Sequence, residues 1–348
     1  MNIDLHVHSR FSKRPSQWIL QKIGCPESFT EPLQVYRIAR RRGMSMVTIT
    51  DHNTIDGAME IAHLPDVFIS EEVTAYFPED GCKLHLLALD ITEDHHREIG
   101  RLRRNVYELS AYLNQAGICH VAAHPVYAVN DRLSLAHFER MLLLFRNFEL
   151  NGARNDRQNR DLRAVLASLS PADIDHLADR HGIPPVGNTP WRKNLVGGSD
   201  DHSGLNIART HTRVPGAVTV RDLMEGIREG RAEVAGHAST PRTMAHNLYG
   251  IAYQYYRNKF NLARHAGKDR LLRFLETSLN CETEPECGLM RRIVYFLNDR
   301  RQVRDAGGMP DTLMGWIRAE TDRLLREHPE IMDAAREGGT APWDRERN

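Results

Sequence analysis

Short apolar runs alternate with longer amphipathic stretches over the first two thirds of the chain. Most of the short runs are rich in Val, Ile and Leu and are apolar enough to be buried on both faces, which is typical of strands in a parallel sheet. We expect strands at residues 3–8, 46–50, 67–73, 84–89, 118–123, 147–150 and 195–198.

The stretches between these runs have the apolar spacing of helices, and several end in basic residues followed by Gly. Gly is the usual helix stop because it takes the left-handed conformation at little cost, and cations stabilise the negative end of the helix dipole. The expected helices cover residues 31–42, 94–115, 134–146, 161–168, 171–180 and 220–229. A repeated strand–helix unit closes most naturally into a barrel, with an open sheet as the alternative, so the pattern predicts an α/β fold with a TIM-like barrel.

The pattern changes near residue 240. Residues 244–263, 269–279, 288–301 and 312–327 are predicted to be helical, with no comparable strand among them. We therefore expect a barrel domain over residues 1–238 and a mainly helical C-terminal region over residues 239–348. The tyrosines of this region favour packing on the barrel or on a second subunit over stacking on nucleic-acid bases, so one expectation is a homo-oligomer formed through these helices.

Composition limits the classes of partner. The 348 residues include 46 basic and 46 acidic side chains, so overall charge gives no reason to expect bulk binding to nucleic acid or to a membrane. No apolar run reaches about 18 residues and the N-terminus lacks a signal-peptide pattern, so we expect a cytoplasmic protein without a membrane segment. The five cysteines are scattered and odd in number, which fits reduced thiols.

Histidines and carboxylates recur where the expected strands end. A strand period of two places His6 and His8 on the same face, opposite the apolar residues of the first strand. Because the carboxyl ends of barrel strands line the active site, and buried charges must be paired or bind metal, this recurrence predicts a metal centre. His120 lies deeper along its strand and is expected to be a core histidine. The other candidates exceed what one ion needs: Asp51, His52, Glu71, Glu72, His85, His124, Asn151, Asp200, Asp201 and His202.

Six motifs carry a resemblance to a known family. They are His6-x-His8 after Asp4-Leu5, Thr50-Asp51-His52, Glu72-Val73-Thr74, His85-Leu86-Leu87, Ala123-His124-Pro125 and Gly198-Ser199-Asp200-Asp201-His202. In order and approximate spacing they resemble the polymerase and histidinol phosphatase (PHP) family over about residues 1–235. The resemblance implies a distorted barrel of about seven strand–helix units. It also implies two to three divalent ions of manganese, iron or zinc that serve phosphate-ester hydrolysis by a water activated between metals.

Carried over residue by residue, the family pattern implies three metal positions. The first ion would be held by His6, His8, Glu72 and Asp200. Glu72 would bridge to a second ion, which is held by His85 and His124. The third ion would be held by His52 and His202. The candidate catalytic residues are Glu72, Asp200 and His202, and without the third ion His202 would protonate the leaving group.

Two choices between adjacent carboxylates follow from spacing. Glu72 is preferred to Glu71 because it alternates with polar residues, whereas Glu71 alternates with apolar ones. Asp200 is preferred to Asp201 because it stands two residues before the last histidine of its motif. Asp51 is expected to orient a ligand histidine, since metal-bound imidazoles usually donate their other N–H to a carboxylate or carbonyl.

One position departs from the family pattern. Family members commonly carry an aspartate shortly after the first motif, where this chain has Lys13. A third site should then be weak or empty because like charge opposes metal binding, unless Lys13 turns to solvent and Glu27 or Glu31 completes the site. The candidates to bind substrate phosphate, with solvated loop cations as the alternative for the basic ones, are Arg10, Lys13, Arg14, Asn151, Arg154 and His237.

Three classes of function fit these observations. The neutral charge favours a phosphatase acting on a small phosphorylated metabolite or nucleotide. The first alternative is a phosphodiesterase or exonuclease on nucleic acid, for which the C-terminal region would have to form a nucleic-acid arm. The second is a non-catalytic, metal-stabilised assembly module, which has no need to keep so many ligand residues. An amidohydrolase barrel also begins with His-x-His but lacks the Glu-Val-Thr and Ser-Asp-x-His motifs.

Overall fold

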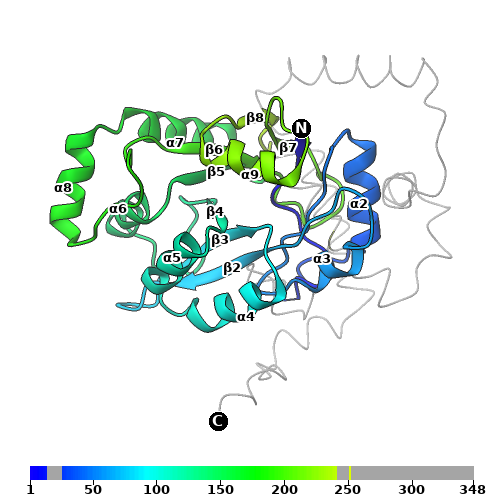
Figure 1. Ribbon diagram of the computed structural model, residues 1–348, viewed down its shortest axis with the longest axis horizontal. Coiled ribbons are helices and arrows are strands. Elements are labelled where there is room, and N and C mark those ends of the chain that lie inside the picture. Colours follow the sequence, from blue (N-terminus) through cyan, green and yellow to red (C-terminus); the bar gives the residue numbers. More distant parts are fainter. Residues whose placement is uncertain (14–25, 241–250, 252–348) are drawn as a thin grey trace, which may run out of the picture. The chain divides into compact units, whose positions relative to one another are not determined.

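The computed structural model describes residues 1–13, 26–240 and 251 (Figure 1). The chain divides into two compact units, Met1–Ser16 with Pro26–Asn280 and Gln17–Cys25 with Cys281–Asn348. Every described residue belongs to the first unit. The helices expected at 244–263, 269–279, 288–301 and 312–327, and the candidate Arg14, therefore lie outside the described residues.

The larger sheet has five strands in the order β2-β3-β4-β5-β6. They are β2 (Ser70–Tyr76), β3 (Lys83–Leu89), β4 (Cys119–Ala123), β5 (Asn147–Asn151) and β6 (Asn194–Gly198). The pairs β2–β3 and β3–β4 are antiparallel, whereas β4–β5 and β5–β6 are parallel. The expected all-parallel sheet is thus wrong for its first half, because a connection as short as residues 77–82 joins only antiparallel neighbours.

A smaller antiparallel sheet follows the order β1-β7-β8, with β1 (Asn2–Ile3), β7 (Thr210–Arg213) and β8 (Glu233–Gly236). The described strands form these two sheets and no closed barrel, so the expected TIM-like closure is not observed. The strands expected at 3–8 and 46–50 are reduced to β1 and isolated bridges such as Val7 with Asp201. One reason is that the Asp4 carboxylate, instead of a strand partner, binds the N–H groups of Ser199 at 2.8 Å and Ala208 at 2.7 Å.

The helices of the described residues lie around these sheets (Figure 1). They are α2 (Pro32–Arg41), α3 (Asp56–Ile61), α4 (Glu93–Leu102), α5 (Val106–Gln115), α6 (Leu135–Leu144), α7 (Asp156–Ser168), α8 (Pro171–His181) and α9 (Val220–Arg228). The single helix expected at 94–115 is two helices, because α4 ends at its C-cap Arg103 and Asn105 caps the start of α5 by accepting from Tyr107 N–H. None of the described helices is long and apolar enough to cross a membrane.

The larger sheet is buried on both faces, as its apolar runs predict. Leu84, Leu86 and Ala88 of β3 pack into one apolar cluster, whereas Leu87 and Leu89 belong to a second cluster on the other face. Because side chains alternate along a strand, His85 lies on the face of the second cluster. The polar candidates on this face therefore lie beside the second apolar cluster.

Candidate metal centre

Four donor atoms form a compact cage at the centre of the candidate site. The Nε2 atoms of His6 and His8 lie 3.1 Å apart, and each is 3.3 Å from Glu72 Oε2. Each is also 3.5 Å from Asp200 Oδ1. A tetrahedral ion with bonds of about 2.0–2.1 Å would set its ligand atoms roughly 3.3–3.4 Å apart. The spacing therefore fits one metal ion among the four atoms.

Hydrogen bonds behind the cage orient its two histidines. His6 Nδ1 lies 2.9 Å from Glu149 Oε1, and His8 Nδ1 lies 2.9 Å from Ser12 Oγ. Ser12 Oγ itself donates to Asp51 Oδ1 at 2.8 Å, so it accepts from His8. With both Nδ1 atoms acting as donors, both Nε2 lone pairs point into the cage. Such partners commonly fix the tautomer and the ring orientation of metal ligands.

The expected role of Asp51 is therefore met through an intermediate. Its carboxylate accepts from Ser9 N–H at 2.7 Å, from Ser9 Oγ at 2.6 Å and from Ser12 Oγ. The histidine that it orients is His8, reached through Ser12, rather than the adjacent His52. Burial raises the pKa of Asp51, while the bonds from Ser9 and Ser12 oppose this shift.

Glu72 lies between two groups of histidines. Its Oε2 faces the cage of His6 and His8, and its Oε1 lies 2.8 Å from His85 Nδ1 and 3.1 Å from His124 Nε2. Strand β2 presents Glu72 and the antiparallel strand β3 presents His85, while His124 follows the end of β4. A carboxylate divided in this way can bridge two cations about 3.5–4 Å apart.

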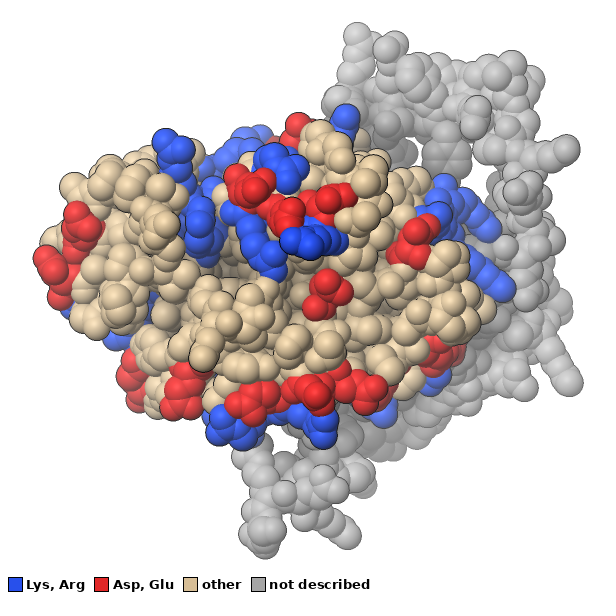
Figure 2. Space-filling view, viewed as in Figure 1, with Lys and Arg blue, Asp and Glu red and all other residues tan. Residues whose placement is uncertain are grey.

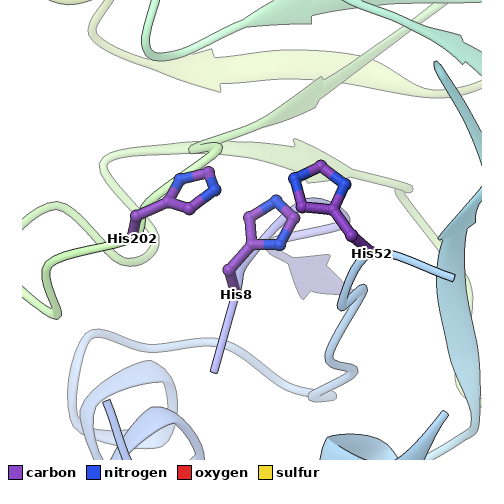
Figure 3. A group of neighbouring side chains, drawn as sticks. All are labelled: His8, His52 and His202. Carbon is purple, nitrogen blue, oxygen red and sulfur yellow. The ribbon is translucent and has the colours of Figure 1, made fainter. Parts of the chain in front are cut away.

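A third group of histidines lies beside the cage. Figure 3 shows His8, His52 and His202 turned toward one another, and the rings of His8 and His202 stack with centroids 3.9 Å apart. Glu27 lies with this group, its Oε2 being 3.1 Å from His52 Nε2 and its Oε1 3.5 Å from His202 Nε2. These atoms offer nitrogen and carboxylate donors for one further ion.

Lys13, the residue at which the sequence departs from the family pattern, lies at the surface. Lys13 is exposed, whereas Glu27 is buried beside the two histidines. Glu31, the other carboxylate considered, pairs with Arg10 at the surface. The alternative in which Lys13 turns to solvent and a nearby carboxylate joins the third group is thus the one that the structure supports.

The donor set fits metal ions better than hydrogen bonds alone. Glu72 Oε2, His85 Nδ1 and His202 Nε2 are buried, and no hydrogen bond of suitable geometry reaches them within the described residues. Glu72 Oε2 nevertheless lies 3.3 Å from His6 Nε2, and His85 Nδ1 lies 2.8 Å from Glu72 Oε1. Four groups of three side chains could each hold an ion, their ligand atoms lying within 4.8 Å of one another: His6-His8-Glu72, His6-His124-Asp200, His52-Glu72-His85 and His8-His52-His202.

Electrostatics keep the central carboxylates ionised despite their burial. Burial opposes the charge of Glu72, yet His85, His52 and His6 hold its pKa well below the ordinary value. Burial and the neighbouring His202 lower the pKa of His8 to about 3, so its ring is neutral at working pH. Against the opposing effect of burial, Glu149 and Glu72 raise the pKa of His6 well above its ordinary value, and Glu72 and Glu27 do the same for His52. Because a metal ion requires neutral imidazoles, metal binding would displace a proton from each of these two ligands.

Two of the candidate ligands have unusual backbone conformations. His124 has φ of 29° and Asp200 has φ of 51°, both in the left-handed region that non-Gly residues seldom adopt. Asp200 N–H donates to His6 O at 2.7 Å, which holds this turn against the first strand. Strain of this kind clusters at functional sites, where the surrounding structure maintains it.

Glu71 and Asp201, the two carboxylates that were not chosen as ligands, make their contacts outside the cage. Glu71 is buried on the other side of β2, where its Oε2 lies 3.0 Å from His96 Nδ1. Asp201 Oδ1 accepts from Ser203 Oγ at 2.9 Å and from the N–H of residue 206. The geometry therefore supports the preference for Glu72 and Asp200.

Glu149 is a residue that the sequence reasoning missed. Besides His6 Nδ1, it accepts from His124 N–H and from Asn151 Nδ2, both through Oε2. It therefore forms hydrogen bonds with two candidate ligands, His6 and His124. The signal was present, because Asn147, Glu149 and Asn151 alternate with apolar residues in β5 and so share one face.

The candidate substrate-binding residues differ in position. Arg154 lies beside the cage, with Nη2 3.8 Å from Asp200 Oδ2 and its guanidinium 3.8 Å above the ring of Tyr127. Asn151 is buried and donates to Asp200 Oδ2 at 3.1 Å, which favours a positioning role over the expected substrate contact. His237 is exposed, two residues before Ser239, whose N–H donates to Arg154 O.

The loop cations of the first motif do not point to a shared phosphate site. Arg10 is neutralised by Glu31 at 2.5 Å and by Glu60 at 2.8 Å. Lys13 is exposed, and Arg14 lies outside the described residues. Within the described part of the chain, Arg154 is therefore the best placed of the predicted cations.

No protein-family model matches the chain. An uncharacterized protein of Methanocaldococcus jannaschii is 38% identical over 73 residues, which are 21% of this chain. The chain thus spans 41% of the length of that relative.

Two solved structures are similar in fold. A two-domain protein of Bacteroides vulgatus that contains a predicted PHP-like metal-dependent phosphoesterase has a TM-score of 0.42 and 15% identity, over 73% of this chain and 69% of that chain. The lesion-specific endonuclease EndoQ of Pyrococcus furiosus has a TM-score of 0.38 and 17% identity, over 67% of this chain and 57% of that chain.

Proposed function

We propose that the chain is a PHP-type, metal-dependent hydrolase of phosphate esters. The observation that carries the proposal is the division of the Glu72 carboxylate between two groups of histidines. A buried bridging carboxylate among imidazoles, with a second carboxylate at Asp200, is the ligand chemistry of a centre with more than one transition metal. Such a centre serves hydrolysis, because it combines activation of water with neutralisation of phosphoryl charge.

Each candidate ligand then has a stated role. His6, His8 and Asp200 hold the first position, His85 and His124 hold the second, and Glu72 bridges them. His52, His202 and Glu27 hold the third. Divalent ions of manganese, iron or zinc, when bound, would acidify a water and stabilise negative charge on phosphoryl oxygens.

Arg154 is the residue that we assign to the substrate phosphate. Tyr127 supports its guanidinium from below, and its buried Nε has no hydrogen-bond partner within the described residues. A guanidinium offers a planar pair of donors that matches phosphate geometry. One well-placed arginine suits a small phosphorylated metabolite or nucleotide better than the extended backbone of a nucleic acid, which needs several phosphate contacts.

His202 is the candidate to protonate the leaving group when no third ion is bound. Its side chain is 12% exposed, whereas those of His6, His8 and Glu72 are fully buried, so it lies toward the open side of the centre.

The test is hydrolysis of phosphorylated metabolites and short oligonucleotides by protein loaded with manganese, iron or zinc. We expect at least two metal equivalents by elemental analysis and metal-dependent release of phosphate. Glu72→Gln and Asp200→Asn should lower turnover by about a hundredfold or more, because each removes a charge that holds or bridges metal.

Glu71→Gln is the matched control. It changes a carboxylate of equal burial one residue away, which contacts His96 instead of the cage. We expect its turnover and metal content to stay near wild type. A fully active metal-free enzyme would refute the proposal, and equal losses at positions 71 and 72 would refute the assignment of Glu72.

A further inference from the structure

A second hollow, of about 300 Å³, lies at the other end of the larger sheet. Cys119 and His120 open β4 and Asn147 opens β5, and all three line this hollow. The metal-centre residue His124 follows the opposite end of β4. At about 3.3 Å of rise per residue, His120 and His124 are roughly 13 Å apart. The hollow is therefore distinct from the metal centre.

The charge around this hollow is mainly positive. Arg146 and Arg228 line it, and no acidic residue is among its described lining. Arg228 Nη2 donates to Gly117 O at 2.5 Å, which fixes the guanidinium at the rim, and Asp90 is an acidic neighbour that Arg228 influences. Figure 2 shows Lys and Arg side chains gathered with acidic ones over α9, the helix that ends at Arg228.

Arg146 is held in place yet has donor capacity left. Its Nε is buried and makes no hydrogen bond within the described part of the chain. The side chain lies across Gly187, where an added Cβ would meet Arg146 Cδ at 3.1 Å, so the glycine leaves room for it. Burial, together with the charge of Arg146, lowers the pKa of the nearby Lys193 to about 7. No carboxylate of the described lining therefore offsets the charge of Arg146, whereas Asp90, outside the lining, partly offsets that of Arg228.

The remaining polar groups define what the hollow can bind. His120 Nδ1 lies 2.9 Å from Ile118 O and donates to it, which leaves Nε2 as an acceptor. Asn147 is already used, since it donates to His120 O and accepts from Asn194. The hollow thus offers two guanidinium groups and one imidazole acceptor, which match the oxygens and the hydroxyl of a phosphate monoester.

We propose that this hollow is a second binding site, which takes the phosphate group of a small molecule through Arg146 and Arg228. Its volume lies at the lower end of the range for small-molecule sites, so it suits a phosphate with a small organic group or a free phosphate ion. This site does not depend on the chemistry proposed for the metal centre.

Equilibrium dialysis of the metal-loaded full chain with inorganic phosphate tests the proposal. Phosphate held at the metal centre is measured separately, as inhibition of ester hydrolysis. We expect Arg146→Gln and Arg228→Gln each to weaken binding at the second site by about tenfold or more, since each removes charge-assisted hydrogen bonds. Neither variant should change the inhibition constant of phosphate. Arg221→Gln, an exposed change on the same helix, is the matched control.

The two sources of phosphate are separated by repeating the dialysis with glycerol phosphate. Tighter binding than that of inorganic phosphate indicates an organic phosphate ligand, and equal binding indicates the free ion. The proposal is overturned if wild type binds phosphate only at the metal centre, or if Arg146→Gln and Arg228→Gln bind it as Arg221→Gln does. Because Arg228 is exposed, its variant tests the site even if the Arg146 variant fails to fold. If the protein hydrolyses no ester, equilibrium dialysis still measures phosphate binding at the second site.

Discussion

At the scale of single residues, Glu27 changes the picture most. It stands 19 residues after the first motif's His8, yet its carboxylate lies between His52 and His202. These two histidines help to lower the pKa of Glu27 to about 2 against the opposing effect of burial. The negative charge that is missing at Lys13 is therefore supplied by Glu27, a residue outside the first motif.

We predict that Glu27→Gln removes one metal equivalent and leaves two. An amide keeps the size of the side chain but lacks the negative charge that holds a divalent ion. Elemental analysis after dialysis against a fixed metal concentration measures this loss. Lys13→Ala is the control and should leave three equivalents, because Lys13 is exposed. Equal metal content in wild type and Glu27→Gln would contradict the assignment of Glu27.

At the scale of elements, Lys193 joins the end of α6 to the start of β6. Its ammonium donates to Leu142 O and to Phe145 O, which are carbonyls at the C-terminal end of α6. Burial lowers its pKa from 10.5 to about 7, with a further contribution from Arg146. Because the pKa is depressed on folding, the contribution of Lys193 to the stability of the fold is most favourable above pH 10.5 and is lost as the pH falls toward 7.

We therefore predict that Lys193→Met gains stability relative to wild type as the pH falls. The difference should grow between about pH 10.5 and pH 7 and reach at most roughly 5 kcal/mol, less the cost of the two lost hydrogen bonds. Urea unfolding at pH 6 and at pH 10 measures it. Lys83→Met, at a partly exposed lysine, should show a smaller pH effect. A difference that grows with rising pH would show that the ammonium stabilises the fold.

At the scale of the whole molecule, the centre is assembled from the entire described part of the chain. Its candidate ligands extend from His6 to His202, and Asp4 ties the first strand to Ser199 and Ala208. The domain boundary expected near residue 240 stays a prediction, and the compact unit that holds the centre extends to Asn280. Ile251, beyond the expected boundary, is 3% exposed and so is buried.

We predict that a chain ending at residue 240 keeps its metals but unfolds at a lower temperature than one ending at residue 280. The shorter chain lacks Ile251, and burial of one Ile contributes about 1.5–3 kcal/mol. Elemental analysis and thermal unfolding of both chains check this. If the shorter chain were equally stable but lost turnover by about a hundredfold, the C-terminal region would have a role in catalysis.

The sequence by itself determined the buried strands β3 to β6, because their apolar residues are best buried inside a sheet that is covered on both faces. It also predicted that Glu72 and Glu71 lie on opposite faces of their strand, since strand parity separates the two faces. It did not reveal β7, which is short and polar, or that β2, β3 and β4 are antiparallel. The tertiary structure alone decided that Glu27, and not Glu31, lies beside His52 and that Glu149 lies beside His6, because long-range packing brings together residues that are distant along the chain.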